Sequence, residues 1–281
     1  MGTRWYSAKK CALRFGAALA LAACTTAAAA DSRRIEILPS EHPISKMVVE
    51  VAQVDALPMV GGNGVIVGRD GCHVLTNFHV AFGIDKDSNY KVTFVPDVAV
   101  GHVLAVKADL NPETRTFNRA MTARVIGYGN YDPGVRRKMK HDLALLQLDT
   151  CLGPSYGVLN FELPGTSNNV PQGTLSTLSL KKHSSTVSIL KHQRSCTSLT
   201  DTNIAGIFYQ TCESESGMSG SPILRRESDG EYTLVGLTSG LWVVPGEPDV
   251  PFAIYSSVIT PFVEDLIRPG TLRRAPRRSP P

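Results

Sequence analysis

Three residues of the sequence, His79, Asp142 and Ser219, are of types that can together perform nucleophilic catalysis. A serine hydroxyl is a poor nucleophile at neutral pH, so it needs an adjacent base that accepts its proton. An imidazole suits this role because its unperturbed pKa lies near neutrality. A buried carboxylate can fix the imidazole tautomer and stabilise the imidazolium that forms. In such a set, Ser219 would be the nucleophile, His79 the general base and Asp142 the residue that orients the base.

Two glycines beside the serine suit the backbone of such a site. A reaction through a tetrahedral intermediate needs preorganised donors for the developing oxyanion. Gly217 allows a tight turn in which its N–H and that of Ser219 can point at one position, so these two residues are the predicted oxyanion hole. Gly220 keeps side-chain bulk away from a substrate backbone.

The segments around these residues carry family motifs. Residues 75–80 read LTNFHV, residues 141–146 read HDLALL and residues 217–222 read GMSGSP. The chain resembles the trypsin-like (chymotrypsin-fold) serine peptidase family, which has its histidine, aspartate and serine in this order and in such contexts, and it looks most like bacterial members. The resemblance covers residues 47–265, and the separations of 63 and 77 residues between the three candidates fit it.

This resemblance implies both a fold and an activity. The fold is all-β, with two six-stranded antiparallel β-barrels packed together and a short C-terminal helix. The activity is that of a serine endopeptidase, which hydrolyses peptide bonds of proteins through an acyl-enzyme intermediate and uses no cofactor and no metal. The residue before the nucleophile is Met218 rather than the aspartate of zymogen-activated members, so we do not expect activation by a freed N-terminus.

The resemblance extends, with less specificity, to candidate substrate-binding residues. Glu213 lies six residues before the nucleophile, where digestive members place the floor of the specificity pocket, and a carboxylate there would favour Lys or Arg substrates. Ser239 and Gly240 lie on a segment similar to the strand that binds the substrate backbone, and Ser239 or Thr238 is expected to hydrogen-bond Asp142. An ordinary core strand is the alternative for these side chains.

Other histidines and serines near the motifs fit the site less well. His141 precedes Asp142, and because neighbouring strand residues point to opposite faces, we expect only Asp142 to face the site. Ser214, Ser216 and Ser221 flank the nucleophile but lack its glycine setting.

The remaining pattern predicts the elements that would position these residues. Short β-rich runs form two successive groups on either side of a Gly/Pro/Asn-rich stretch near 163–173, which favours two β-barrels over alternating strands and helices. One helix is expected at the end of the domain, with Thr260 as its cap and Pro261 at its first position. The expected strands are residues 64–68, 73–76, 91–95, 124–127 and 143–148 in the first group, and 173–180, 186–190, 207–212, 222–224, 232–239 and 251–259 in the second.

Four cysteines outside the N-terminal segment, Cys72, Cys151, Cys196 and Cys212, suggest two disulfides in an oxidising compartment, with three possible connectivities. In the fold that the resemblance implies, the strand ending at the histidine lies antiparallel beside the strand starting at the aspartate. The expected pairs are therefore Cys72–Cys151 and Cys196–Cys212, the second of which closes a loop before the nucleophile turn. Reduced thiols in the core are the alternative, whereas no C-x-x-C or H-x-x-x-H spacing supports a metal site.

The N-terminus has the pattern of an export signal. A positively charged start precedes the apolar run at residues 15–23 and small residues at an A-x-A cleavage site, so residues 1–30 are predicted to be a signal peptide. The alternative is a lipoprotein signal over residues 1–23, with an acylated Cys24 that attaches the protein to a membrane. Either route exports the protein to the periplasm, the cell envelope or the medium.

The mature chain divides into an N-terminal arm at residues 31–46, a peptidase domain at residues 47–267 and an Arg/Pro-rich tail at residues 268–281. The tail has almost no apolar residues to bury and is expected to be disordered. The net charge of +4 comes largely from the tail and predicts no nucleic-acid partner. A protein or peptide substrate is the expected partner, and the chain is expected to be a monomer.

Two other functions are compatible with the sequence. The first is a catalytically silent peptide-binding module on the same scaffold, although all three members of the predicted triad are present. The second is an envelope-anchored protein that docks through its Arg/Pro tail, which deletion of residues 269–281 would test.

Overall fold

The computed structural model of the chain divides it into two compact units, Met1–Ala30 and Asp31–Pro281. The first unit, with the predicted export signal and Cys24, lies outside the described residues. Within the described part of the chain, no helix is both long and apolar enough to cross a bilayer. The structure describes residues 34–54, 61–83, 85–86, 92–93, 100–132, 135–157, 159–162, 171, 173–184, 186–199, 204–242, 250–267 and 273–274.

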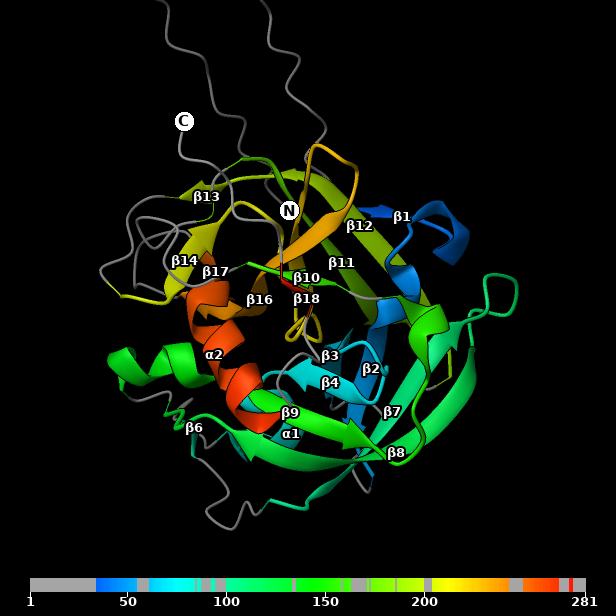
Figure 1. Cartoon of the computed structure of the whole chain (residues 1–281), viewed down its shortest axis with the longest axis horizontal. Coiled ribbons are helices and arrows are strands. Elements are labelled where there is room, and N and C mark those ends of the chain that lie inside the picture. Colours follow the sequence, from blue (N-terminus) through cyan, green and yellow to red (C-terminus); the bar gives the residue numbers. More distant parts are fainter. Residues whose placement is uncertain are drawn as a thin grey trace, which may run out of the picture. The chain divides into compact units, whose positions relative to one another are not determined.

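The first half of the second unit is a closed antiparallel barrel, visible in blue to green in Figure 1. Its strands follow the order β2-β3-β4-β9-β8-β7. A short two-stranded sheet, β5 (Asp85–Lys86) with β6 (Val92–Thr93), is separate from the barrel. The barrel strands are β2 (Val48–Gln53), β3 (Gly61–Val67), β4 (His73–Thr76), β7 (Val103–Leu110), β8 (Phe117–Tyr128) and β9 (Ala144–Leu148).

The second half contains six further long strands in one sheet, with neighbours in the order β12-β11-β15-β16-β17-β14. The all-β fold with two groups of six strands is therefore confirmed, and among the described residues the hydrogen-bonded ring closes in the first group. These strands are β11 (Leu175–Lys182), β12 (Ser188–Cys196), β14 (Ile207–Gln210), β15 (Pro222–Arg226), β16 (Tyr232–Trp242) and β17 (Val250–Tyr255). Short strands extend the sheet: β1 (Ile35–Glu36), β10 (Asn160–Phe161), β13 (Ser198–Leu199) and β18 (Arg273–Arg274).

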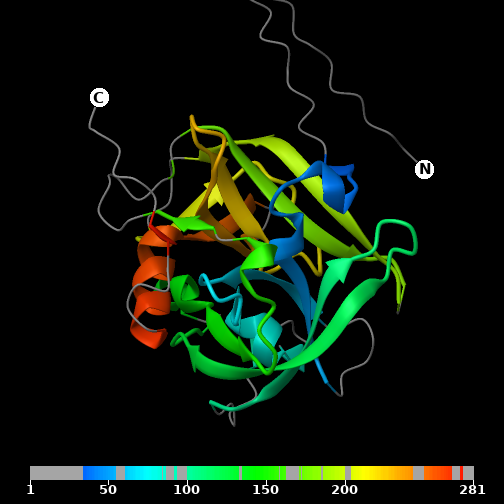
Figure 2. The ribbon, with the colours of Figure 1, turned by 45° about the vertical axis from the view of Figure 1, so that its right-hand side comes forward.

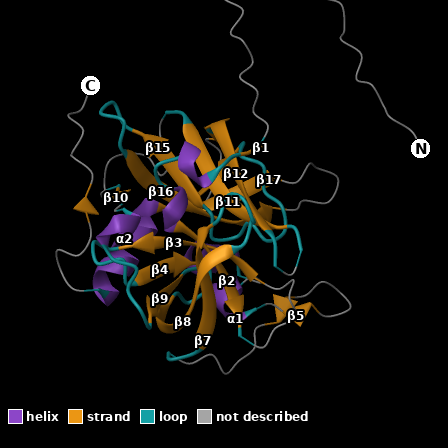
Figure 3. Ribbon diagram, turned by 90° about the vertical axis from the view of Figure 1, so that its right-hand side faces the viewer, coloured by secondary structure: helices purple, strands orange, loops and turns teal. Residues whose placement is uncertain are grey.

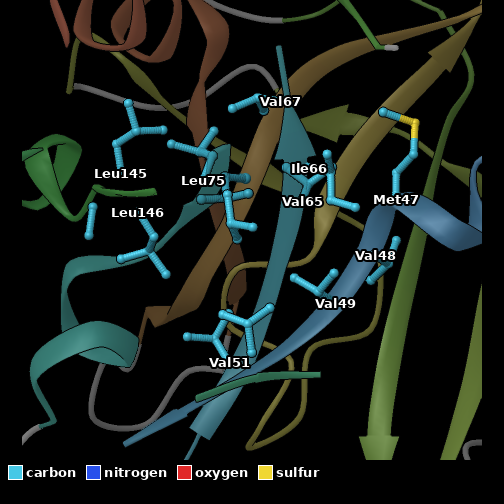
Figure 4. Packing of buried hydrophobic residues seen from close by; sticks show 14 of the residues in the cluster. Met47, Val48, Val49, Val51, Val65, Ile66, Val67, Leu75, Leu145 and Leu146 are labelled. Carbon is cyan, nitrogen blue, oxygen red and sulfur yellow. The ribbon is translucent and has the colours of Figure 1, made fainter. Parts of the chain in front are cut away.

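Buried aliphatic side chains pack on both faces of the barrel strands β2, β3, β4 and β9 (Figure 4). Val51, Ile66, Leu75 and Leu146 are all inaccessible to solvent. The same apolar cluster continues into the second half through residues such as Leu178 of β11, so the two halves share one core. Burying such a side chain stabilises the fold by roughly 1.5–3 kcal/mol relative to leaving it exposed.

The C-terminal helix is present but begins earlier than the sequence predicts. Helix α2 spans Ser256–Leu266, which places Pro261 inside it and ends β17 at Tyr255 (Figure 3). The Thr260 hydroxyl does not cap the helix, because it donates a 2.9 Å hydrogen bond to the Glu162 carbonyl. The Ser256 hydroxyl donates to the Glu162 carboxylate at 3.0 Å. These two bonds fix Ser256 and Thr260 against Glu162, so the helix begins before the proline.

The N-terminal arm lies against the second sheet rather than apart from it (Figure 2). Strand β1 pairs antiparallel with β12, so that Ile35 lies opposite His192. Two short 3-10 helices follow, η1 (Pro39–Glu41) and η2 (Ser45–Met47).

Two residues of the tail that was expected to be disordered, the strand β18, pair in parallel with β10 through their backbone. Such pairing needs no apolar side chain, which is why composition did not predict it. The other tail residues lie outside the described residues.

Two disulfides link the cysteine pairs expected from the resemblance, Cys72–Cys151 and Cys196–Cys212. Their Cα atoms are 4.2 and 5.0 Å apart. The first follows from strand pairing, because β4 and β9 are antiparallel neighbours and the cysteines lie beyond the ends that meet.

One buried carboxylate joins the barrel to the second sheet. Glu50 of β2 is 7% exposed. Its carboxylate binds Lys107 of β7 at 3.0 Å, approaches Lys182 of β11 at 3.6 Å and accepts a 2.9 Å hydrogen bond from the Ser188 hydroxyl of β12. Two positive charges and a hydroxyl converge on this carboxylate. It therefore provides a charged hydrogen-bond partner for groups from both halves of the fold.

We expect Glu50→Ala to lower the free energy of unfolding by about 2 kcal/mol, since it leaves Lys107 and Lys182 without their shared partner. Urea denaturation measures the change. The matched control is Glu36→Ala, whose pair with Arg115 is 45% and 49% exposed and should contribute less than about 1 kcal/mol. Equal losses of unfolding free energy in the two variants would contradict the conclusion that Glu50 joins the barrel to the second sheet.

Candidate active site

His79 and Asp142 meet in a close pair at one end of the barrel. His79 lies in the short helix α1 (Phe78–Phe82), which begins two residues after β4 ends. Its Nδ1 is 2.7 Å from Asp142 Oδ2, and its backbone N–H donates to Asp142 Oδ1 at 3.0 Å. The Asp142 side chain is inaccessible to solvent. Both carboxylate oxygens are therefore engaged by the same histidine.

Strand register explains why two residues 63 positions apart meet. Strands β4 and β9 pair antiparallel with Thr76 opposite Ala144, so the segments beyond these residues face each other. Asn77 closes the junction, because its side-chain amide donates a 2.9 Å hydrogen bond to the Asp142 carbonyl. The sequence around His79 thus fixes the backbone of Asp142 as well as its side chain.

His141 was excluded from the site on the expectation that it and Asp142 are neighbours on a strand, and this expectation was wrong. His141 and Asp142 do not lie on a strand: His141 ends the 3-10 helix η3 (Arg136–His141), and Asp142 is the residue that follows it. The pair-forming residue is still Asp142. Burial, followed by the charges of Lys140 and Lys138, lowers the pKa of His141.

Ser239 connects Asp142 to Ser219. The Ser239 hydroxyl donates to Asp142 Oδ2, which confirms the sequence-based expectation for Ser239 rather than Thr238. The Ser239 carbonyl accepts a 3.3 Å hydrogen bond from the Ser219 hydroxyl. The Thr238 hydroxyl is buried and has no hydrogen-bond partner within the described part of the chain. Gly240 follows at a point where the β16–β17 register shifts.

The turn that carries Ser219 is tightly constrained. Gly217 and Gly220 have φ values of +87° and +82°, in the region that favours glycine. The Gly220 N–H donates to the Thr238 carbonyl at 2.9 Å, and the Met218 N–H donates to the Glu215 carbonyl at 3.1 Å. The N–H groups of Gly217 and Ser219 make no hydrogen bond to any described residue. Two backbone donors at this turn are thus available to a ligand.

Helix α1 and the serine turn approach each other at Gly62 of β3. A Cβ atom on Gly62 would lie 2.6 Å from the Val80 side chain and 2.7 Å from the Ser219 carbonyl oxygen. Only glycine lets the two segments come this close. Across the residues that the structure describes, the Ser219 hydroxyl bonds to Ser239 and makes no hydrogen bond to His79.

Asn63 holds the serine turn in place, a role that was not predicted from the sequence. Its side-chain amide donates to the Gly217 carbonyl at 2.8 Å and to the Leu180 carbonyl at 3.2 Å, and it accepts from the Leu180 N–H at 2.7 Å. Its backbone N–H donates to the Ser219 carbonyl at 2.7 Å. Asn63 is fully buried. The one signal in the sequence is a polar residue among glycines in an apolar strand.

Arg34 of the arm also contacts the segment before Ser219. Its guanidinium donates to the Ser179 hydroxyl at 2.7 Å and to the Glu213 carbonyl, and it lies against the Met218 sulfur. Burial lowers the pKa of Arg34 to about 10, and the Glu215 and Glu213 carboxylates partly offset this effect. Nothing in the sequence around Arg34, which follows the predicted cleavage site, indicates this contact.

The Glu213 side chain is exposed, and its backbone is anchored by the Gln193 side chain, which accepts from the Glu213 N–H at 2.8 Å. Its suggested role in substrate preference stays a prediction. Among the described residues, no group of three or more His, Cys, Asp or Glu side chains is placed to hold a metal ion.

Comparison with known proteins identifies the family. Residues 62–237 match the family described as the trypsin-like peptidase domain. The chain belongs to the trypsin-like peptidase family. The matched range of this trypsin-like peptidase contains His79, Asp142 and Ser219.

A solved structure shares the fold of this trypsin-like peptidase at low sequence identity, and a second one gives a weaker match. A Glu endopeptidase in complex with MPD is 16% identical, with a TM-score of 0.54, over 84% of this chain and 97% of that chain. The MamO protease domain from Magnetospirillum magneticum, in its apo form, is 18% identical, with a TM-score of 0.44, over 79% of this chain and 97% of that chain. No curated protein matches the sequence significantly.

We expect Gly220→Ala to destabilise this trypsin-like peptidase more than Gly153→Ala does. Both glycines have nearly the same φ, +82° and +81°, so both variants carry backbone strain of about 1–3 kcal/mol. A Cβ at Gly220 would lie 1.8 Å from the Asn63 carbonyl oxygen, whereas one at Gly153 meets nothing within 4 Å. Gly220→Ala should therefore cost about 2 kcal/mol more by urea denaturation. Equal midpoints would show that the turn does not pack against β3 as described.

Proposed function

We propose that this member of the trypsin-like peptidase family is a serine endopeptidase, with Ser219 as nucleophile, His79 as general base and Asp142 as the orienting carboxylate. One observation carries the proposal: Asp142 is fully buried and directs both carboxylate oxygens at His79. Burying an ionised carboxylate is costly unless it is well hydrogen-bonded. A buried carboxylate hydrogen-bonded to Nδ1 of an imidazole, with a serine in a glycine turn nearby, is the arrangement that acyl transfer needs.

The proposed reaction has two halves. The Ser219 oxygen attacks the substrate carbonyl carbon while His79 Nε2 takes the hydroxyl proton. The resulting oxyanion accepts hydrogen bonds from the N–H groups of Gly217 and Ser219, which have no partner among the described residues. His79 then gives its proton to the leaving amine, and an acyl-enzyme remains. Water, deprotonated by His79, releases the acid and restores the serine.

Asp142 acts on this reaction through His79. A hydrogen bond from Nδ1–H to Asp142 Oδ2 fixes the tautomer that leaves Nε2 free to accept the serine proton. It also stabilises the imidazolium in both halves of the reaction. The hydroxyl of Ser239 holds the same carboxylate oxygen in place, so Ser239 is proposed as a positioning residue.

A silent peptide-binding module is the second candidate, and one observation favours it. The Ser219 hydroxyl donates to the Ser239 carbonyl instead of to His79. That hydrogen bond is long at 3.3 Å, and rotation of the serine side chain would release it. Catalytic hydrogen bonds are often loose without substrate and tighten when it binds.

Substrate binding and location are further parts of the proposal. We assign the edge of β16 at Ser239 and Gly240 to the substrate backbone, and a protein or peptide is the expected partner. Export through the segment at residues 1–30, or through Cys24, agrees with the two disulfides, which persist mainly in oxidising compartments.

Ser219→Ala should abolish labelling by a fluorophosphonate probe and lower casein hydrolysis by about 10⁶-fold, because it removes the proposed nucleophile. The control is Ser216→Ala, an exposed serine three residues away that should label like the wild type. Labelling is followed by intact mass and the modified residue by peptide mapping. A wild-type protein that stays unlabelled between pH 6 and pH 9 would favour the silent module.

Ser239→Ala should lower kcat/KM by about tenfold, the effect of one hydrogen bond to a charged group. Removing this donor leaves more negative charge facing His79, so the acid limb of the kcat/KM profile should move to higher pH. Ser239→Thr should restore the profile. Thr238→Val is the matched control, because the Thr238 hydroxyl has no hydrogen-bond partner among the described residues. An unchanged pH profile in Ser239→Ala would remove Ser239 from its proposed role.

A further inference from the structure

A cleft lies between the N-terminal arm and the second sheet, at the far end of β15 from Ser219. Strand β15 starts at Pro222, three residues after Ser219, and ends at Arg226 in the cleft, about 13 Å further along an extended strand. The cleft has a volume of about 690 Å³. It is lined by residues from the arm, β11, β12, β15 and β16, among them His42, Ser176, His192, Arg194, Arg226 and Tyr232.

Two buried histidines form one wall of this cleft. His42 and His192 are 4% and 5% exposed, and their ring centroids are 4.6 Å apart in an edge arrangement. Tyr232 packs against the His42 ring, with ring centroids 4.8 Å apart. The Nε2 atoms of both histidines are buried and have no hydrogen-bond partner among the described residues. Buried polar atoms of this kind are uncommon in folded proteins and need an explanation.

The tautomer of His42 follows from its other nitrogen. The Ile44 N–H donates to His42 Nδ1 at 3.4 Å, so Nδ1 carries no proton. Burial, together with the nearby His192, Arg194 and Arg226, lowers the pKa of His42 to about 4, and the ring is neutral at pH 7. A neutral imidazole with an accepting Nδ1 has its proton on Nε2. His42 therefore contributes a buried N–H donor without a described partner.

The charge around the histidines is positive. Arg194 and Arg226 are exposed, and neither forms an ion pair with a described residue. By contrast, Arg225 is held by Glu162 at 2.9 Å and by Glu227 at 3.0 Å. The acidic side chain in the lining, Glu41, accepts a hydrogen bond from the Leu38 N–H at the edge of the arm. Two guanidinium groups that pair with no described carboxylate thus line the cleft, which disfavours a metal cation.

We propose that this cleft binds a small molecule that carries a carboxylate or phosphate group, with its oxygens accepting hydrogen bonds from the guanidinium groups of Arg194 and Arg226 beside the neutral wall of His42 and His192. Guanidinium groups form charge-assisted, often bidentate, hydrogen bonds to such oxyanions. The volume matches clefts that hold ligands of metabolite size. The site is independent of the proposed peptidase activity, because none of these residues contacts the His79–Asp142 pair or Ser219.

Isothermal titration of the purified protein with two probes, citrate and pyrophosphate, tests the site and separates carboxylate from phosphate ligands. We expect saturable, one-to-one binding of at least one probe to the wild type at low ionic strength. The double variant Arg194→Gln/Arg226→Gln should weaken that binding at least tenfold, since it removes both charge-assisted donors.

The control variant removes two positive charges from a part of the surface outside the cleft. Arg69 and Arg137 are exposed and lie outside the cleft, so Arg69→Gln/Arg137→Gln should bind the probe like the wild type. Two results would overturn the proposal: no saturable heat with either probe at millimolar concentration, or equal weakening in the two double variants, which would reflect net charge alone. Hydrolysis by the wild type plays no part in the readout, so failure of the proposed peptidase activity leaves this test unaffected.

Discussion

The structure depends on keeping the carboxylate of Asp142 buried and fully hydrogen-bonded. Removing an ionised carboxylate from water costs several kcal/mol, which only well-placed donors offset. Here the donors come from two halves of the fold: the backbone and ring of His79 follow the barrel strand β4, and the hydroxyl of Ser239 comes from β16 of the second sheet. The Asn77 side chain fixes the carbonyl of the same residue. The site therefore exists only while the barrel and the second sheet remain joined.

The joint between the halves is built from buried polar groups at specific points of an apolar interface. Asn63 of β3 ties the barrel to β11 and to the serine turn, with both ends of its amide satisfied. Glu50 binds groups from β7, β11 and β12. Apolar contact between the halves is continuous but not directional. These hydrogen bonds and ion pairs set the relative position of His79 and Ser219 more closely than apolar contact can.

The sequence was sufficient for features that depend on local pattern and chain order. The motifs predicted that His79 and Asp142 lie together, and the strand pairing that the family resemblance implied predicted Cys72–Cys151. Features that depend on distant contacts were missed or misread. Arg34 reaches Met218 across the sheet, and Asn63 acts through Leu180, 117 residues away. Local propensity placed the start of α2 at Thr260, because bonds from Ser256 and Thr260 to Glu162 cannot be seen in sequence.

The hydrogen bond between His79 Nδ1 and Asp142 is the element on which the proposed mechanism rests, and proton NMR observes it directly. We expect a strongly deshielded imidazole proton in the wild type that is retained in Ser219→Ala, lost in His79→Gln and lost in Asp142→Asn, with the fold of each variant checked by circular dichroism. Asp142→Asn keeps the size of the side chain but removes the charge that attracts this proton. Absence of this resonance from the wild-type spectrum, or its presence in Asp142→Asn, would contradict the proposed hydrogen bond between His79 Nδ1 and Asp142.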